Sequence, residues 1–242
     1  MSVTGLQNTT SRTVTRRVSL VLLLTSLSIY STAARSPGAR DAASADRLAE
    51  SVDRHYNSLR TFKADFQDGY RGAGVERAES GTLLLKKPGK MRWDYQQPRS
   101  KVFLSDGKTA FFYVAGERQA RRTPVKKLDD LRSPLRYLLG RTKLKQELEK
   151  LELAPGTNSE KTAPGNLVLR GAPKGVADRV KQVELEINPQ SQIVRITLQE
   201  VDGATTTFRF SNIVENLTLP DDRFRFTPPP GVEMVESTEF AP

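Results

Sequence analysis

Residues 81–113 read GTLLLKKPGKMRWDYQQPRSKVFLSDGKTAFFY and are the most regular part of the chain. Short apolar-rich segments are separated here by the turn signals Pro88-Gly89, Gln97-Pro98 and Asp106-Gly107. Alternating runs of this length between turn residues are typical of antiparallel strands joined by tight connections. The stretch therefore predicts an antiparallel meander.

Large apolar side chains recur at every second residue of this meander. Because successive side chains of a strand point to opposite faces, this spacing places them on a single face of the sheet. The residues predicted to share that face are Leu83, Leu85, Met91, Trp93, Tyr95, Val102, Leu104, Phe111 and Tyr113.

The rest of the chain adds more strands and a few helices. Apolar residues at three- and four-residue steps predict an amphipathic helix over residues 42–60. Proline near its start and glycine at its end predict a short helix at residues 134–139, and a second is predicted at 142–151. Further strands are predicted at residues 62–70, 117–123, 166–170, 181–188, 192–201, 204–213 and 224–226. The sequence thus predicts a mainly β (α+β) chain with about 10–11 strands.

The N-terminus predicts where the protein works. Three arginines precede an uncharged apolar run at residues 18–29, and small residues follow it. This pattern predicts a cleaved signal at residues 1–34 and one domain at residues 35–242. Residues 1–34 carry three Arg and no acid, so their removal lowers the net charge from +10 to +7. The absence of cysteine excludes disulfides, a thiol nucleophile and a lipidated cysteine anchor.

The sequence favours a non-enzymatic protein. His55 is the only histidine and is predicted to be a solvated helix residue, with no nucleophile elbow or phosphate-binding loop elsewhere. Asp129-Asp130 and Asp221-Asp222 are interpreted as surface or cap residues rather than metal ligands. No metal, cofactor or nucleic-acid partner is therefore predicted. The predicted helices are few for so large a sheet, which makes an apolar cavity plausible, although such a face can also be an ordinary core.

Seven segments stand out by their order and spacing along the chain. They are LRTFKADFQ (59–67), the stretch from Gly81 to Pro88, MRWDY (91–95) with Pro98, LSDGKT (104–109), the aromatic run 111–113, residues 134–139 and FRFTPPPGV (224–232). Taken together, and not by any one of them, they resemble the LolA-type family of periplasmic outer-membrane lipoprotein carriers. The resemblance covers nearly all of residues 35–242.

The resemblance implies an incomplete antiparallel β-barrel, with an N-terminal helix and a helical lid over an apolar cavity. It implies a monomeric periplasmic chaperone that receives triacylated lipoproteins from an inner-membrane ABC-type release complex and delivers them to an outer-membrane receptor. The implied cavity adds Leu135, Leu138, Leu185, Ile187, Phe208 and Phe210 to the nine meander residues. Lys87 occupies the position of the family's lid-gating arginine, so a gating role is implied for it.

Two other classes stay open on the sequence alone. One is a regulatory module of the same half-barrel shape that senses lipid or lipoprotein and binds a signalling partner. The other is a lipid-processing enzyme, against which the solitary His55 argues. Hydrolysis of a lipid ester by the purified protein would support the enzyme.

Overall fold

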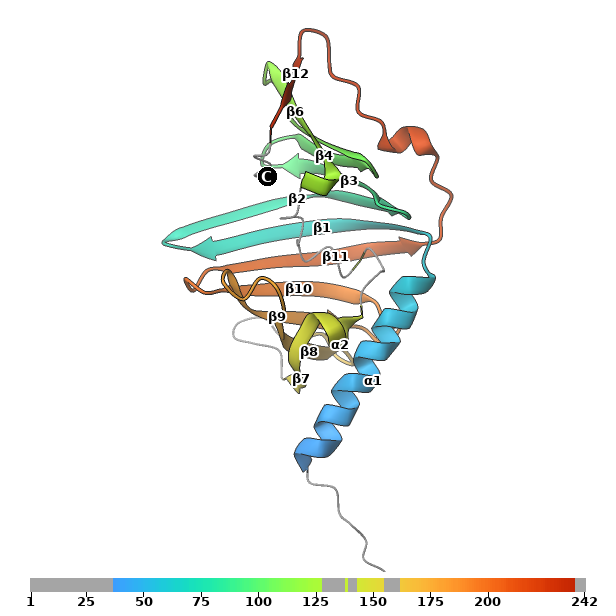
Figure 1. Cartoon of the computed structure of the whole chain (residues 1–242), viewed down its shortest axis with the longest axis vertical. Helices are drawn as coiled ribbons and strands as arrows, with labels where there is room; N and C mark the ends of the chain where they lie inside the picture. Colours follow the sequence, from blue (N-terminus) through green and yellow to red (C-terminus); the bar gives the residue numbers. More distant parts are fainter. Residues whose placement is uncertain (1–36, 128–137, 139–142, 155–161, 238–242) are drawn as a thin grey trace, which may run out of the picture. The chain divides into compact units, whose positions relative to one another are not determined.

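The computed structural model describes residues 37–127, 138, 143–154 and 162–237 (Figure 1). Of residues 37–43 it describes only the helical backbone. Contacts divide the chain into residues 1–34 and 35–242, and every described residue belongs to the second unit. The predicted signal, and Leu135 of the predicted lid, lie outside the described residues.

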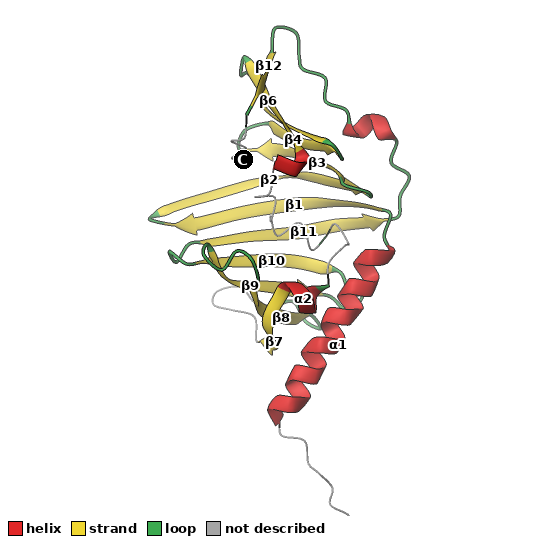
Figure 2. Ribbon diagram, in the orientation of Figure 1, coloured by secondary structure: helices red, strands yellow, loops and turns green. Residues whose placement is uncertain are grey.

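Strands make up most of the described chain (Figure 2). The first six are β1 (Thr61–Gly72), β2 (Val75–Lys86), β3 (Lys90–Gln97), β4 (Lys101–Asp106), β5 (Thr109–Val114) and β6 (Gln119–Pro124). The other six are β7 (Leu148–Ala154), β8 (Leu167–Pro173), β9 (Val180–Ile187), β10 (Ile193–Glu200), β11 (Thr205–Glu215) and β12 (Glu233–Glu236). The sequence predicts ten of these and misses β7 and β12.

The strands form one sheet in the order β12-β6-β5-β4-β3-β2-β1-β11-β10-β9-β8-β7. Neighbouring strands run antiparallel except for the parallel pair of β12 and β6. Within the described residues β12 and β7 are the two edges and do not pair with each other, so the sheet is open. The predicted mainly β, unclosed antiparallel sheet is confirmed, and the pairing of β1 with β11 joins its two halves.

The helix α1 (Pro37–Ser58) is the helix predicted at residues 42–60. It packs against β7, β8 and the one-turn helix α2 (Leu144–Glu147), as Figure 1 shows. Its buried side chains recur at three- and four-residue steps, namely Ala45, Ala49, Val52 and Tyr56. No helix in the described part of the chain combines the length and the apolar character of a membrane span.

The predicted helix at residues 142–151 is only half correct. Its first part forms α2, whereas the chain from Leu148 onward is extended and pairs with β8 as β7. Leu144 and Leu148 are both buried, so the same apolar spacing serves a helical turn and the start of a strand. Four-residue spacing alone did not distinguish these structures because the segment is short.

One face of the sheet, which we call the inner face, carries the main buried cluster and packs against α1. Residues directly opposite each other on neighbouring strands share a face. Leu83 lies opposite Trp93, Trp93 opposite Phe103, and Phe103 opposite Phe112. The inner-face residues of β4 and β5 are therefore Phe103, Phe112 and every second residue from them along each strand.

This register corrects the prediction that all nine meander residues share one face. The prediction holds for the residues of β2 and β3, but four residues of β4 and β5 lie on the opposite face: Val102, Leu104, Phe111 and Tyr113. Val102 pairs with Tyr113 and Leu104 with Phe111, so the residues predicted on β4 and β5 agree with each other. A one-residue error in the predicted register after Gln97-Pro98 therefore assigned both strands to the wrong face. β4 has apolar residues at successive positions, so its alternation did not fix the register.

The opposite face, which we call the outer face, is covered in the region of β3 and β4 by the chain that follows β11. The short 3-10 helix η3 (Asp221–Phe224) packs on β3 and β4, and Phe224 and Leu219 bury Leu84. The ring of Phe226 lies 5.4 Å from that of Phe111. The strand predicted at residues 224–226 is therefore wrong, because this segment packs onto the sheet instead of pairing within it.

Candidate functional site

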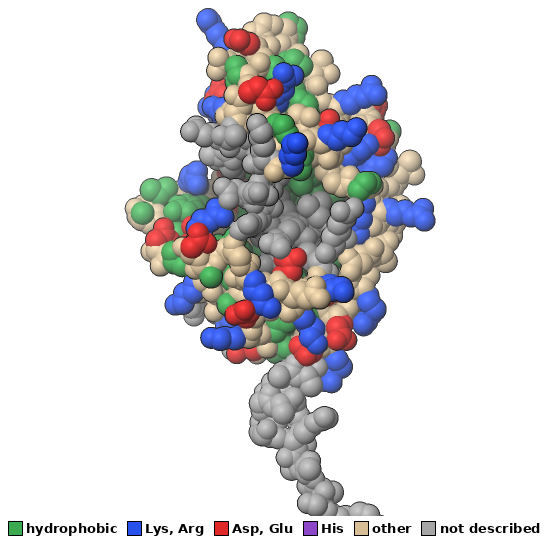
Figure 3. All heavy atoms as spheres, in the orientation of Figure 1, with side chains coloured by type: hydrophobic (Ala, Val, Ile, Leu, Met, Phe, Trp, Pro, Cys, Tyr) green, Lys and Arg blue, Asp and Glu red, His purple; other side chains and the backbone are tan. Residues whose placement is uncertain are grey.

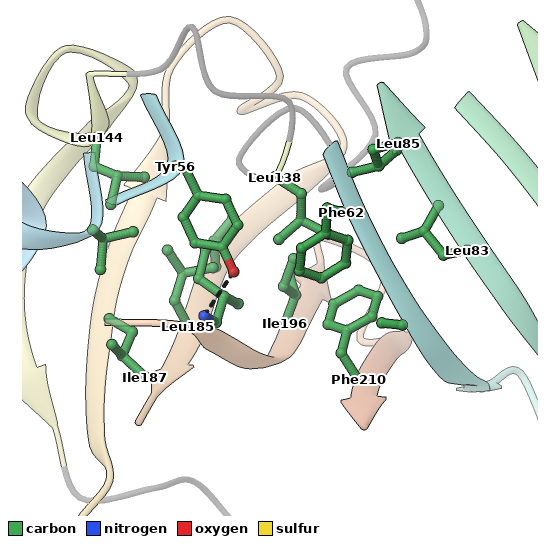
Figure 4. Close-up of a cluster of buried hydrophobic side chains, with 14 of the residues drawn as sticks. Tyr56, Phe62, Leu83, Leu85, Leu138, Leu144, Leu185, Ile187, Ile196 and Phe210 are labelled. Carbon is green, nitrogen blue, oxygen red and sulfur yellow. Dashed lines mark hydrogen bonds between the residues drawn. The ribbon is translucent and has the colours of Figure 1, made fainter. Parts of the chain in front are cut away.

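The inner face holds one continuous apolar cluster drawn from both halves of the sheet. Figure 4 shows side chains of α1, β1, β2, β9, β10 and β11 pointing toward one another in this cluster. At its centre lies Phe66, whose ring centroid is 4.6 Å from that of Trp93 and 4.9 Å from that of Tyr95. Both contacts are edge-on. The ring of Phe208 contacts Trp93 at 6.0 Å. The arrangement forms a large apolar and aromatic wall.

Most of the residues predicted to line a cavity come together on this wall. Those in the buried cluster are Leu83, Leu85, Met91, Trp93, Tyr95, Leu138, Leu185, Ile187 and Phe210, and Phe208 packs against it while partly exposed. The outer-face residues Val102, Leu104, Phe111 and Tyr113 do not belong to the wall.

The site prediction omitted Phe62, Phe66 and Phe103, which all contribute to the inner face. Phe62 and Phe66 lie opposite Leu85 and Gly81 on β2, so the β1–β2 register places them in the wall. The sequence did contain a signal for these two residues. Apolar and polar side chains alternate over residues 62–70, which is typical of a half-buried strand, and this segment precedes the meander. Phe103 was missed through the register error in β4.

Tyr56 and Leu138 both pack into the wall from outside the sheet. The side chain of Tyr56 on α1 is fully buried, and its hydroxyl accepts a hydrogen bond from the backbone N–H of Ile193 at 2.9 Å (Figure 4). Burial raises the pKa of this hydroxyl above its ordinary range. Leu138, the one described residue of the predicted lid segment, is 2% exposed and belongs to the same cluster.

Lys87 lies just beyond β2 and reaches the C-terminal end of α1. Its Nζ donates a hydrogen bond to the backbone carbonyl of Tyr56 and a longer one, of 3.4 Å, to that of Asn57. Burial lowers the pKa of the ammonium group. Cations are favoured beside the carbonyls of a helix C-terminus, because those groups have no partner within the helix. Lys87 therefore fastens the end of α1 to the edge of the wall.

His55 is not the solvated helix residue that the sequence predicts. Its Nε2 lies 2.8 Å from Glu215 Oε1, and both side chains are 19% exposed. Gln192 donates to the same carboxylate oxygen at 3.0 Å. The pair joins α1 to β11, which the sequence could not show because the two residues are 160 positions apart.

Polar groups replace the apolar wall toward the far end of β1. The inner-face residues there are Asp68 and Tyr70, with Glu79 opposite Asp68. Glu79 forms a 2.8 Å ion pair with Lys101, whose Nζ also lies 4.3 Å from the centre of the Tyr95 ring. A cavity of about 270 Å³ opens here, lined by Asp68, Tyr70, Arg77, Glu79, Glu200, Thr206 and Phe208.

Asp68 makes stability at this end depend on pH. Burial, followed by the charge of Glu79, raises the pKa of its carboxyl from 3.8 to about 6, while Lys101 and Arg77 oppose the rise. The folded protein thus holds the proton more tightly than the unfolded chain, so this contribution to stability is present below pH 3.8 and is lost as the pH rises through about 6.

We expect Asp68→Asn to remove this loss of stability at higher pH. At pH 7.5 the variant should exceed the original protein in free energy of unfolding by about 1–2 kcal/mol, allowing for partial exposure, and the gap should shrink at pH 5. Urea denaturation at the two pH values measures this difference in free energy of unfolding. Asp178→Asn, at an exposed loop position, is the control and should change neither value. A pH-independent gap for Asp68→Asn would contradict the expectation.

Basic side chains do not form one continuous patch on the face shown in Figure 3, where acidic groups lie among them. Lys86 and Lys90 both pair with Asp221, at 2.7 and 2.8 Å, and Arg122 pairs with Glu236. The two lysines lower the pKa of the Asp221 carboxyl to about 2. Asp221 is thus a surface ion-pair residue, in agreement with its interpretation from sequence.

Comparisons with known proteins place the chain in a family. Residues 57–227 match the family described as "Outer membrane lipoprotein carrier protein LolA". An outer-membrane lipoprotein carrier protein of Nitrosospira multiformis is 27% identical over 182 residues, covering 74% of this chain and 83% of its own length. The corresponding protein of Bordetella pertussis is 30% identical over 164 residues, covering 67% of this chain and 72% of its own.

The crystal structure of a LolA superfamily protein from Nitrosomonas europaea matches with 13% identity and a TM-score of 0.43, covering 75% of this chain and 97% of that one. The family match extends from the C-terminal end of α1 to the segment on the outer face, and so includes every wall strand. The chain therefore belongs to the LolA family of outer membrane lipoprotein carrier proteins.

Proposed function

We propose that this protein binds the acyl chains of lipoproteins against the inner face and carries them between membranes. The observation that carries the proposal is the wall itself: a single apolar surface spans both halves of the sheet, and α1 and the side chain of Leu138 pack on it. Each methylene kept from water contributes about 0.8 kcal/mol, so such a wall can hold an acyl chain that would otherwise aggregate or insert into a membrane.

Binding to this wall requires its cover to move. Leu83, Phe66 and Trp93 are at most 2% exposed in this structure, so an acyl chain reaches them only when a covering segment is displaced. The proposed cycle is loading at an inner-membrane ABC-type release complex, transit through the periplasm as a monomer, and delivery to an outer-membrane receptor. The cleaved signal, the periplasmic location and these partners are parts of the proposal supported by the family relationship.

The first test is native mass spectrometry. The full chain is expressed with export to a bacterial periplasm, and the protein is purified without detergent. A co-purifying triacylated lipoprotein is the expected result. Free lipid alone would indicate a lipid transporter or sensor. A ligand-free protein that also fails to take up a lipoprotein from detergent would contradict the proposal.

Matched substitutions on one strand locate the binding surface. Phe208 lies on the inner face of β11, whereas Val214 lies on the same strand opposite Lys63 and is 47% exposed. We expect Phe208→Asn to reduce lipoprotein uptake about tenfold or more, because it removes a ring from the wall, and Val214→Asn to leave uptake unchanged. Equal uptake by the two variants would place binding elsewhere.

Lys87 is proposed to control release. Its hydrogen bonds to the backbone carbonyls of Tyr56 and Asn57 hold the end of α1 in place, so they oppose any shift of α1 that admits the ligand. We expect Lys87→Leu to slow acyl release at least threefold, while thermal stability changes little because the group is partly exposed. Lys87→Arg, which retains a donor, is the control. A release rate for Lys87→Leu within error of the original protein would refute the role.

The proposal involves no catalysis. His55 is engaged by Glu215, and the wall presents apolar side chains rather than a nucleophile with a base. Hydrolysis of a lipid ester by the purified protein would contradict this part of the proposal.

A further inference from the structure

The wall contains a buried polar atom that has no partner among the described residues. Trp93 is 2% exposed, and its indole Nε1–H makes no hydrogen bond within that part of the chain. Buried donors are almost always paired, because water has been removed from them and nothing has replaced it. An unpaired donor in the middle of a proposed binding surface indicates an acceptor supplied by the ligand.

Among the described residues, the neighbours of Trp93 are mainly apolar side chains, and none of them accepts its N–H. Across the neighbouring strands it lies opposite Leu83 and Phe103, and its ring contacts Phe66, Tyr95 and Phe208. Phenylalanine or methionine would also present an apolar side chain here, without an unpaired N–H. The indole is therefore an unusual choice for a surface that only packs.

Trp93 also stands at the boundary between apolar and polar parts of the inner face. Along β1 the inner-face residues change from Phe62, Ala64 and Phe66 to Asp68 and Tyr70. The cavity of about 270 Å³ lies on the polar side, and Phe208 both lines this cavity and contacts Trp93. An amphiphile lying along this gradient would place its chain on the wall and its head at the cavity, with the linkage between them near Trp93.

We propose that the indole N–H of Trp93 donates a hydrogen bond to the acyl carbonyl that joins a bound chain to its head group. The inference rests on the proposed function and adds the chemical group that is recognised. A carbonyl oxygen, in an ester or an amide, is the acceptor that every acyl chain carries at this boundary. Trp93 then distinguishes acylated ligands from hydrocarbon or ether-linked chains of equal length.

The test compares two probes that differ only in this oxygen: 1-palmitoylglycerol and its ether analogue 1-hexadecylglycerol, both delivered from cyclodextrin. Because the chain has one tryptophan, its indole N–H gives a single nitrogen–proton resonance. We expect the ester to shift that proton downfield and the ether not to do so. The ester should also bind about three- to tenfold more tightly, the contribution of one hydrogen bond.

Variants separate the N–H from the ring. Trp93→Phe keeps an aromatic ring in the wall and should abolish the preference for the ester, while Tyr113→Phe, on the outer face, should retain it. Equal binding of the two probes, with the same indole shift, would overturn the inference and leave acyl binding intact; the N–H would then be satisfied by an aromatic ring. Binding of neither probe would overturn both the inference and the proposed function. The spectrum of the original protein decides the matter even if Trp93→Phe fails to fold.

Discussion

Replacing Gly81 with alanine is expected to lower the free energy of unfolding by about 3 kcal/mol or more, although only a methyl group is added. A Cβ at this position would lie 1.9 Å from the backbone carbonyl oxygen of Asp94 and 2.9 Å from the Cα of Tyr95. Both atoms belong to the partner strand β3, so no side-chain rotation relieves the clash. The register of β2 and β3 already shifts between Ser80 and Gly81.

The substitution also affects the wall. Gly81 lies opposite Phe66 on one side and Tyr95 on the other, and the absence of a side chain there allows those two rings to touch across β2 at 4.9 Å. Separating β2 from β3 to admit a methyl group would disturb this contact. Loss of stability and loss of acyl binding are therefore expected together.

Gly69→Ala is the matched control, because the nearest atom to its added Cβ is the carbonyl oxygen of Thr207 at 3.9 Å. That is an ordinary contact distance, and the change should stay within about 0.5 kcal/mol. Urea denaturation followed by the fluorescence of Trp93 measures both variants. Equal midpoints for the two glycine variants would show that β2 and β3 tolerate a side chain at residue 81.

Truncating Tyr56 is the second change expected to have a large effect. Its ring is fully buried between α1 and the sheet, and its hydroxyl accepts the backbone N–H of Ile193. Tyr56→Ala removes both the ring and the acceptor and should reduce the free energy of unfolding by about 3–5 kcal/mol. Tyr56→Phe keeps the ring but leaves the N–H of Ile193 buried without a partner, which costs about 1–3 kcal/mol.

The two variants separate packing from hydrogen bonding at one position. Tyr113→Phe, on the outer face, is the control for loss of a hydroxyl and should have little effect. Amide hydrogen exchange at Ile193 should become faster in Tyr56→Phe, because that N–H loses its acceptor. Unchanged stability together with unchanged exchange in Tyr56→Phe would show that the hydrogen bond does not anchor α1.

Strong local patterns in the sequence predicted most of the elements correctly. α1 was predicted because its apolar residues keep helical spacing over several turns, and β10 and β11 because Asp202-Gly203 separates two alternating runs. The wall residues of β2 and β3 were predicted from alternation, whereas those of β9 and β11 were implied by the family resemblance. Alternation identifies a face reliably when only one side of a strand is apolar.

Predictions failed where both sides of a segment are apolar or where the partner is remote. In β4 the run Val102-Phe103-Leu104 fits either face, and the outer layer formed by η3 and Phe226 explains why both are apolar. β12 pairs with β6 in parallel from more than 100 residues away, so no local turn signal announces it. Gly81 belongs to a sequence motif, but its close approach to the backbone of β3 is a feature of the tertiary structure alone.

The sequence by itself determined a mainly β chain with one amphipathic helix and a row of apolar residues on β2 and β3, because these features depend on spacing along the backbone. Only the tertiary structure decided which face β4 and β5 present, which groups hold α1, and that the N–H of Trp93 is buried without a partner. Such properties depend on what lies opposite each residue in space, and residues brought together from distant parts of the chain leave no periodic signal in it.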